Sequence, residues 1–268
     1  MPVSSVTLRR DLSQRNVVRA NDFRSDLSYG EIPSVIYRDE GGTHGNFIPA
    51  SYRSICAHSK WQKRLKKQYT GGRWIPWRGE RTRYELDCAN SSDALLMNVF
   101  CYPRVLCRSH LCTLLGIAPG IVPVFGFKPR VPQVNGRGDQ TETDMKIGDL
   151  LVEAKLTESG FQSATFQLLC RYRDLDEVFE VGDLPVVGEK VRAYQLVRGI
   201  LAAYAIECSF LLLCDGRRTD LVDGWFDVIR AVRSCSFRNR LKLLTWQEIA
   251  AALPARLRQF LDEKYGIS

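Results

Sequence analysis

The stretch ETDMKIGDLLVEAKLTE, residues 142–158, decides the fold. Two short strand-like runs, 143–147 and 150–156, flank a Gly-Asp pair, which is typical of two strands joined by a β-hairpin turn. Side chains alternate across a strand, so Glu153 and Lys155 share one face of the second strand. The pattern therefore predicts opposite charges on one face of a central strand.

Asp144 lies at the start of the first strand of this hairpin, where its carboxylate can converge with that of Glu153. Two carboxylates and a backbone carbonyl form a hard oxygen site that suits Mg²⁺ or Mn²⁺. A lysine beside them can orient or deprotonate a water and stabilise developing negative charge. The alternative is a solvated sheet face with two ion pairs, Glu153 with Lys155 and Asp144 with Lys146, and so short a pattern leaves both interpretations open.

Helical and strand-like segments alternate on both sides of the hairpin. Around it the sequence predicts helices at 93–102, 105–115 and 189–206 and strands at 120–127 and 209–214. Pro123 places the first strand at an edge or a bulge. This order of helix, three strands, helix and strand indicates an α/β fold with a mixed central sheet flanked by helices.

The outer parts of the chain give weaker signals. Residues 1–50 contain scattered Gly and Pro among polar residues and predict an irregular arm, followed by a basic helix at about 59–68. C-terminal helices are expected after the sheet, because Pro254 can begin the last of them. We therefore expect an N-terminal arm and basic, aromatic segment over 1–84 and a catalytic domain over 85–268.

The net charge of +8 is concentrated in one stretch. Residues 53–83 contain ten basic residues and a single acid, Glu80, interleaved with three of the five tryptophans. Such a stretch suits a phosphate backbone with stacked bases, but it also suits a solvated basic helix followed by a loop packed on the core. The candidate nucleic-acid-binding residues are Lys60, Lys63, Arg64, Lys66, Lys67, Arg73, Trp74 and Arg78.

Several classes of protein find no support in the sequence. No window is long and apolar enough to span a membrane, and the N-terminus lacks a signal pattern, so a cytoplasmic protein without a membrane partner is expected. The nine cysteines include no Cys-x-x-Cys pair, and the spacings of Cys101, Cys107, His110 and Cys112 match no zinc site. A phosphate-binding loop, a nucleophile elbow and a zinc-protease motif are also absent.

Asp144, Glu153 and Lys155 in this context resemble the signature of the PD-(D/E)XK nuclease superfamily, whose restriction-endonuclease-like core has the order α-β-β-β-α-β. The resemblance covers residues 85–252. It implies metal-dependent hydrolysis of phosphodiester bonds, with Asp144, Glu153 and the Ala154 carbonyl as metal ligands and Lys155 next to the attacking water. Thr143 stands where the family has its leading proline.

The same resemblance extends to less specific features. Gln195 is similar to a helix glutamine that some members place at the active site, although an amide that satisfies a buried polar group is the alternative. Many members carry an acid on the first core helix, and Asp93 and Glu85 are the candidates. The segment His44-Gly-Asn-Phe47 resembles bacterial, mostly uncharacterised members of the superfamily.

The leading hypothesis is therefore a Mg²⁺-dependent endonuclease that acts on DNA, in restriction, phage defence or repair, and a homodimer would allow it to cut both strands. The first alternative is a nucleic-acid-binding module on a nuclease scaffold that does not cut. The second is an α/β protein without a nucleic-acid partner, in which the hairpin charges are ion pairs on the surface.

Overall fold

Two structural units make up the chain. One is formed largely by the middle of the chain, and the other is formed by the segments before and after it. In the computed structural model, which describes residues 3–28, 31–68 and 84–268, unit 1 comprises residues 1–3 and 121–245. Unit 2 comprises residues 4–120 and 246–268. Each unit has its own sheet or helix core, so we treat them one at a time.

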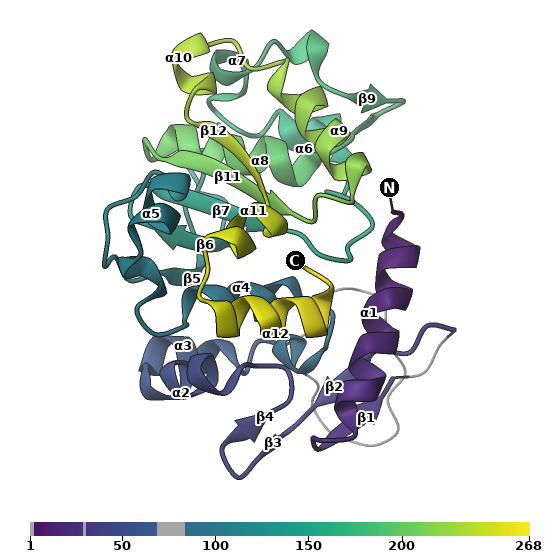
Figure 1. Cartoon of the computed structure of the whole chain (residues 1–268). Coiled ribbons are helices and arrows are strands. Elements are labelled where there is room, and N and C mark those ends of the chain that lie inside the picture. The colour runs from purple at the N-terminus through teal and green to yellow at the C-terminus, as the bar shows by residue number, and fades with distance from the viewer. Residues whose placement is uncertain (1–2, 29–30, 69–83) are drawn as a thin grey trace. The chain divides into compact units, whose positions relative to one another are not determined.

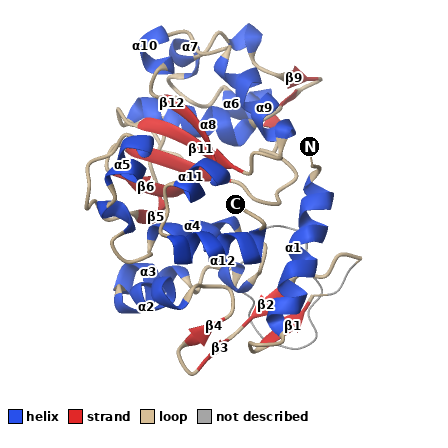
Figure 2. Ribbon diagram, in the orientation of Figure 1, coloured by secondary structure: helices blue, strands red, loops and turns tan. Residues whose placement is uncertain are grey.

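A five-stranded mixed sheet is the centre of unit 1 (Figures 1 and 2). Its order is β12-β11-β7-β6-β5, and its strands are β5 (Val124–Phe127), β6 (Thr143–Ile147), β7 (Leu150–Ala154), β11 (Ser209–Cys214) and β12 (Leu241–Thr245). Strands β5, β6 and β7 are antiparallel, whereas β11 and β12 run parallel to β7. The predicted hairpin is confirmed, and so is the edge position of the strand that follows Pro123.

Helices α8 (Tyr194–Ala205) and α9 (Thr219–Ile229) pack against one face of this sheet. Leu151, Phe210 and Leu212 from β7 and β11 share a core with the apolar faces of both helices. Gly199 allows the close approach of α8, since a Cβ at this position would lie 2.4 Å from the ring of Phe210. The helix predicted at 189–206 is thus confirmed from Tyr194 onward.

Between β7 and α8 the chain forms a series of small elements. They are β8 (Ala164–Thr165), α6 (Phe166–Leu169), α7 (Leu175–Val178), the 3₁₀ turn η3 (Val181–Asp183), β9 (Val186–Val187) and β10 (Lys190–Val191). Helices α6 and α7 are separate because the backbone of 171–173 hydrogen-bonds to residues 132–134. Unit 1 is completed by α10 (Cys235–Arg238).

Unit 2 is mainly helical, with two small antiparallel strand pairs. Its elements are α1 (Ser5–Ala20), β1 (Ser25–Leu27), β2 (Val35–Tyr37), β3 (Asp39–Glu40), β4 (Thr43–His44), α2 (Pro49–Ala57), α3 (Ser59–Arg64), η1 (Glu85–Asp87), α4 (Ser92–Phe100), η2 (Val105–Cys107), α5 (Ser109–Leu115), α11 (Trp246–Ala251) and α12 (Ala255–Tyr265). The predicted basic helix corresponds to α3.

The prediction of an irregular arm over 1–50 is wrong, because residues 5–20 form α1. Ser4 caps this helix by accepting a hydrogen bond from the backbone N–H of Thr7. Only Leu8, Leu12 and Asn16 are buried, so the apolar stripe is too thin to be recognised from the sequence. Contact with α12 supplies the rest of the packing.

The mixed α/β class with a central mixed sheet is confirmed. The division into compact units does not itself test the functional boundary expected between residues 84 and 85, which stays a prediction. None of the helices in the described ranges has the length and apolarity that crossing a bilayer requires.

Candidate active site

Strand pairing in unit 1 brings Asp144 next to Glu153. The pairing of β6 with β7 joins Met145 to Val152, so the residues one step further, Asp144 and Glu153, lie opposite each other. Residues that are paired across two strands share a face of the sheet. The register therefore places the two carboxylates on one face of the sheet, at the end of β7.

Glu153 and Lys155 form an ion pair at this end of the sheet. Lys155 Nζ donates to Glu153 Oε1 over 2.7 Å, and the two side chains are only 6% and 5% exposed. By alternation they share the face of Leu151, which packs in the core with α8. They are thus buried beneath this helix and do not lie on a solvated sheet face.

The charge of Lys155 is maintained by its surroundings. Burial alone would lower the pKa of Lys155, but the nearby carboxylates of Glu153, Glu158 and Asp144 outweigh it, and the pKa is raised. Glu158 is held in place because its Oε2 accepts a hydrogen bond from the backbone N–H of Leu156 at 2.6 Å. Three acids therefore surround one lysine.

Ala154 contributes backbone groups to the same place. Its N–H donates to Oδ2 of Asp144 over 2.7 Å. In an extended strand the N–H and C=O of one residue point to the same side, so the Ala154 carbonyl is directed toward β6 as well. Asp144, Glu153 and this carbonyl form an oxygen donor set of the kind that hard divalent cations prefer.

Gln195 lies in the first turn of α8. This helix leads back to β11, which is parallel to β7, so its N-terminal turn lies at the end of the sheet where β7 finishes. The backbone N–H of Gln195 donates to the carbonyl of Phe161 in the segment that follows β7. Its Oε1 is buried, and no described residue donates a hydrogen bond to it.

Two arginines that the sequence analysis did not single out stabilise the loop after β11. Asp215 is fully buried and accepts from the backbone N–H and the guanidinium of Arg217. Arg218 is also fully buried, and it binds Asp220 through two 2.8 Å hydrogen bonds and the Leu156 carbonyl through one of 3.5 Å. The only sequence signal was the run Asp215-Gly-Arg-Arg-Thr-Asp220 directly after a buried strand.

A second polar network connects the start of β6 to α8. Asp139 Oδ2 accepts from the hydroxyl of Tyr172 at 2.6 Å, and this hydroxyl lies 2.7 Å from that of Tyr194. Arg198, which is 4% exposed, donates to the backbone carbonyl of Glu142 at 3.2 Å. The strand that carries Asp144 and the helix that carries Gln195 are therefore joined by polar contacts.

The predicted nucleic-acid-binding residues fall into three groups. Lys60, Lys63 and Lys66 are exposed in unit 2. Arg64 and Lys67 instead make ion pairs within the unit. Arg73, Trp74 and Arg78 lie outside the described residues.

Asp93 and Glu85, the candidate acids of the first core helix, form a charge cluster inside unit 2. Asp93 Oδ2 accepts from Arg64 Nη2 at 3.0 Å and from Lys67 Nζ at 2.6 Å, and Lys67 also contacts Glu85 at 3.0 Å. Burial and the charge of Asp93 raise the pKa of Glu85. Which acid, if any, completes the hairpin site stays open.

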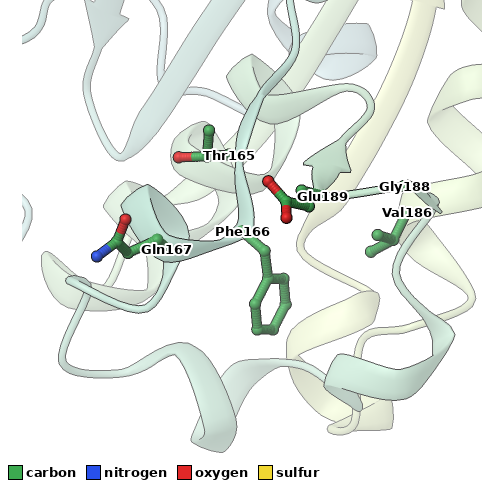
Figure 3. A pocket seen from close by; sticks show the side chains of 6 residues that line it. All are labelled: Thr165, Phe166, Gln167, Val186, Gly188 and Glu189. Atoms are coloured by element: carbon green, nitrogen blue, oxygen red, sulfur yellow. The ribbon is translucent and has the colours of Figure 1, made fainter.

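Outside the hairpin, the described residues offer a hollow and no cluster of metal-ligand side chains. No group of three or more His, Cys, Asp and Glu side chains in this part of the chain could hold a metal ion, and this includes the Cys101 to Cys112 segment. An open hollow of about 580 Å³ lies between α6 and the β9–β10 hairpin, lined by Thr165, Phe166, Gln167, Val186, Gly188 and Glu189 (Figure 3). It contains none of the predicted site residues.

Comparison with known proteins gives one match. A family model described as restriction endonuclease associating with ARP matches residues 18–266. No curated protein and no solved structure matches the chain.

Proposed function

The chain belongs to the family of restriction endonucleases associating with ARP, which supports a nuclease-like role and an interaction with DNA, and on this basis we propose that it is a divalent-metal-dependent DNA endonuclease. The observation that carries the proposal is the pairing of Asp144 with Glu153 beside the buried Lys155. The expected resemblance to restriction-endonuclease-like proteins is confirmed by the family.

The proposed metal ligands are Asp144, Glu153 and the Ala154 carbonyl, with Mg²⁺ or Mn²⁺ as the ion. When bound, such an ion lowers the pKa of a coordinated water and neutralises charge on the scissile phosphate. Lys155 donates to Oε1 of Glu153, and Oε2 of that carboxylate is the donor atom assigned to the ion. The donor set consists of hard oxygens alone, which fits these two ions.

Lys155 and Gln195 are assigned to the water and the phosphate. The ammonium of Lys155 stabilises the negative charge that develops as a water attacks phosphorus. The buried Oε1 of Gln195 lacks a donor among the described residues, and such an acceptor costs about 1–3 kcal/mol when it stays unpaired. A water bound at this atom would offset that cost and be oriented by it.

The exposed Lys60, Lys63 and Lys66 of unit 2 are proposed to contact the phosphate backbone. Arg64 and Lys67 are assigned to the ion pairs with Asp93 and do not contribute to this surface. Cutting of both strands would use a homodimer with one site for each strand.

The non-catalytic binding module is supported by one observation. Glu153 is engaged by Lys155, and no cluster of three potential ligand side chains exists among the described residues. A metal site here would depend on two carboxylates and a carbonyl. The two functions make opposite predictions for cleavage.

The test is cleavage of supercoiled plasmid and linear DNA in Mg²⁺, Mn²⁺ or EDTA. We expect metal-dependent cutting by the wild type and a loss of about 10³-fold or more in Asp144→Asn and Lys155→Ala, because removal of one charge-stabilising group typically costs this much. Asp149→Asn, in the exposed turn of the same hairpin, is the matched control and should cut normally. Binding of DNA without cutting by the wild type would establish the binding module instead.

A further inference from the structure

A second group of cations lies in unit 1 itself, on two segments that are distant in the sequence. Residues 128–138 contain Lys128, Arg130 and Arg137, residues 171–173 contain Arg171 and Arg173, and neither segment contains an acid. All five side chains are exposed. We call residues 128–139 together with 171–173 the basic ribbon.

Backbone hydrogen bonds join these segments into one surface. Gln133 forms a single antiparallel β-bridge with Tyr172, and Pro132 forms one with Gly138, so these three stretches of backbone lie side by side. Val134 donates to the carbonyl of Arg171, and Arg173 donates to that of Pro132. Because Tyr172 is buried, strand alternation directs Arg171 and Arg173 to the opposite, outer face.

The positive charge of the ribbon is only partly balanced. Arg173 pairs with Asp174 at 2.7 Å. Asp139, the one acid within the ribbon, is occupied by Tyr172 and Thr141, and these hydrogen bonds overcome the effect of burial and lower its pKa. Among the described residues, no carboxylate forms an ion pair with the other four cations, Lys128, Arg130, Arg137 and Arg171.

The basic ribbon is anchored at the end of the sheet where the candidate active site lies. Phe127, the last residue of β5, pairs with Thr143, which is the residue before Asp144. Lys128 follows Phe127 directly, so it lies close to the start of β6. At the other side, Tyr172 contacts the hydroxyl of Tyr194 in the first turn of α8, next to Gln195. The ribbon is thus tied to both elements that carry site residues.

We infer that the basic ribbon binds the phosphate backbone of duplex DNA and positions it over the Asp144 and Glu153 carboxylates. This inference rests on the proposed function, since it names the surface that presents the substrate. A site dominated by carboxylates repels a polyanion, so cations directly beside it are needed to hold the backbone. The predicted basic residues of unit 2 are a separate surface.

The test measures binding without cleavage. The full-length protein is titrated onto a fluorescent 20-base-pair duplex in EDTA at several NaCl concentrations, and the slope of log Kd against log salt is compared. For Arg130→Gln/Arg171→Gln we expect weaker binding and a slope smaller by about 2, because each phosphate contact contributes about 0.9.

Two further double variants make the result specific. Arg130→Lys/Arg171→Lys retains the charge and should keep most of the wild-type slope. Arg230→Gln/Arg233→Gln removes two exposed cations after α9, and it should bind as the wild type does. Equal losses in this control and in the ribbon variant, or an unchanged slope in the ribbon variant, would overturn the inference.

The outcomes separate this inference from the proposed function. If the wild type never cuts but the slope of log Kd against log salt is smaller in the ribbon variant, the nuclease proposal fails. The basic ribbon is then still a DNA-binding surface. If Asp144→Asn abolishes cutting while the ribbon variant binds normally, the reverse holds. If polyglutamate competes for the basic ribbon as effectively as unlabelled DNA does, the ribbon would be a binding surface for acidic proteins. That result would overturn the inference.

Discussion

Two clusters of buried charge, one in each unit, differ in their balance. In unit 2, Asp93 and Glu85 face Arg64 and Lys67, so two acids meet two bases. In unit 1, the carboxylates of Asp144, Glu153 and Glu158 lie near Lys155 and raise its pKa, and the adjacent Arg217 and Arg218 pair with Asp215 and Asp220. Where several carboxylates lie close together, a bound cation can offset their mutual repulsion.

The sharpest contrast is expected in stability. Asp93→Asn removes the carboxylate charge that pairs with both Arg64 and Lys67, and it should lower the free energy of unfolding by about 3 kcal/mol or more. In Asp144→Asn the amide oxygen can still accept from Ala154, and repulsion is reduced, so the free energy of unfolding should change by less than about 1 kcal/mol. Urea denaturation of both variants measures the difference. Equal losses of unfolding free energy in Asp93→Asn and Asp144→Asn would show that the two clusters contribute equally to stability.

Metal binding should distinguish the clusters without any measurement of activity. A ligand that binds the folded state at 100 times its Kd stabilises it by about 2.7 kcal/mol, so Mg²⁺ should raise the Tm of the wild type above its value in EDTA. The increase should vanish in Asp144→Asn and persist in the hairpin control Asp149→Asn. An increase of the same size in both variants would place the ion elsewhere.

Lys264 provides the smallest effect, because it is a buried cation that forms no ion pair with any acid in the described part of the chain. Its Nζ donates to Oδ1 of Asn16 at 2.6 Å, and burial, followed by the charge of Arg19, lowers the pKa of Lys264 well below its usual range. The unfolded chain therefore binds a proton more readily than the folded one. The penalty is present at neutral pH and disappears as the pH rises toward 10.5, the unfolded value.

Lys264→Met should accordingly raise the free energy of unfolding by about 1 kcal/mol at pH 7, since it removes a desolvated charge. The difference in the free energy of unfolding between Lys264→Met and the wild type should decrease as the pH increases to 10. Denaturation at a series of pH values measures it, with Lys60→Met, at an exposed position of unit 2, as the surface control. A difference in unfolding free energy that is independent of pH would mean that the pKa of Lys264 is the same in the folded and unfolded chains.

The hairpin was predictable because its signals are local. Alternation, the Gly148-Asp149 turn and the charges at Glu153 and Lys155 all lie within 17 residues, and the structure bears out their arrangement in two paired strands. The edge position of β5 followed from Pro123 alone. For these elements neighbouring residues carry the information.

The remaining features depend on partners that are far apart in the sequence. Lys67, a predicted ligand for DNA, forms an ion pair with Asp93, which lies 26 residues away in the sequence. Helix α1 needs α12 to complete its packing, and the cations of the basic ribbon are brought together only by the bridge between Gln133 and Tyr172. No local pattern reports such pairings, because propensity and periodicity describe one segment at a time.

The discontinuous unit 2 has a consequence for biosynthesis. Asn16 on α1 binds both the backbone carbonyl and the side chain of Lys264, 248 residues later, so this unit is incomplete until the last helix has been made. Nearly all of unit 1, by contrast, is one continuous stretch, residues 121–245. On the ribosome, the usual order of N-terminal folding first is therefore reversed. The acid-rich hairpin can fold early, whereas α1 can complete its packing only after α12 has left the ribosome.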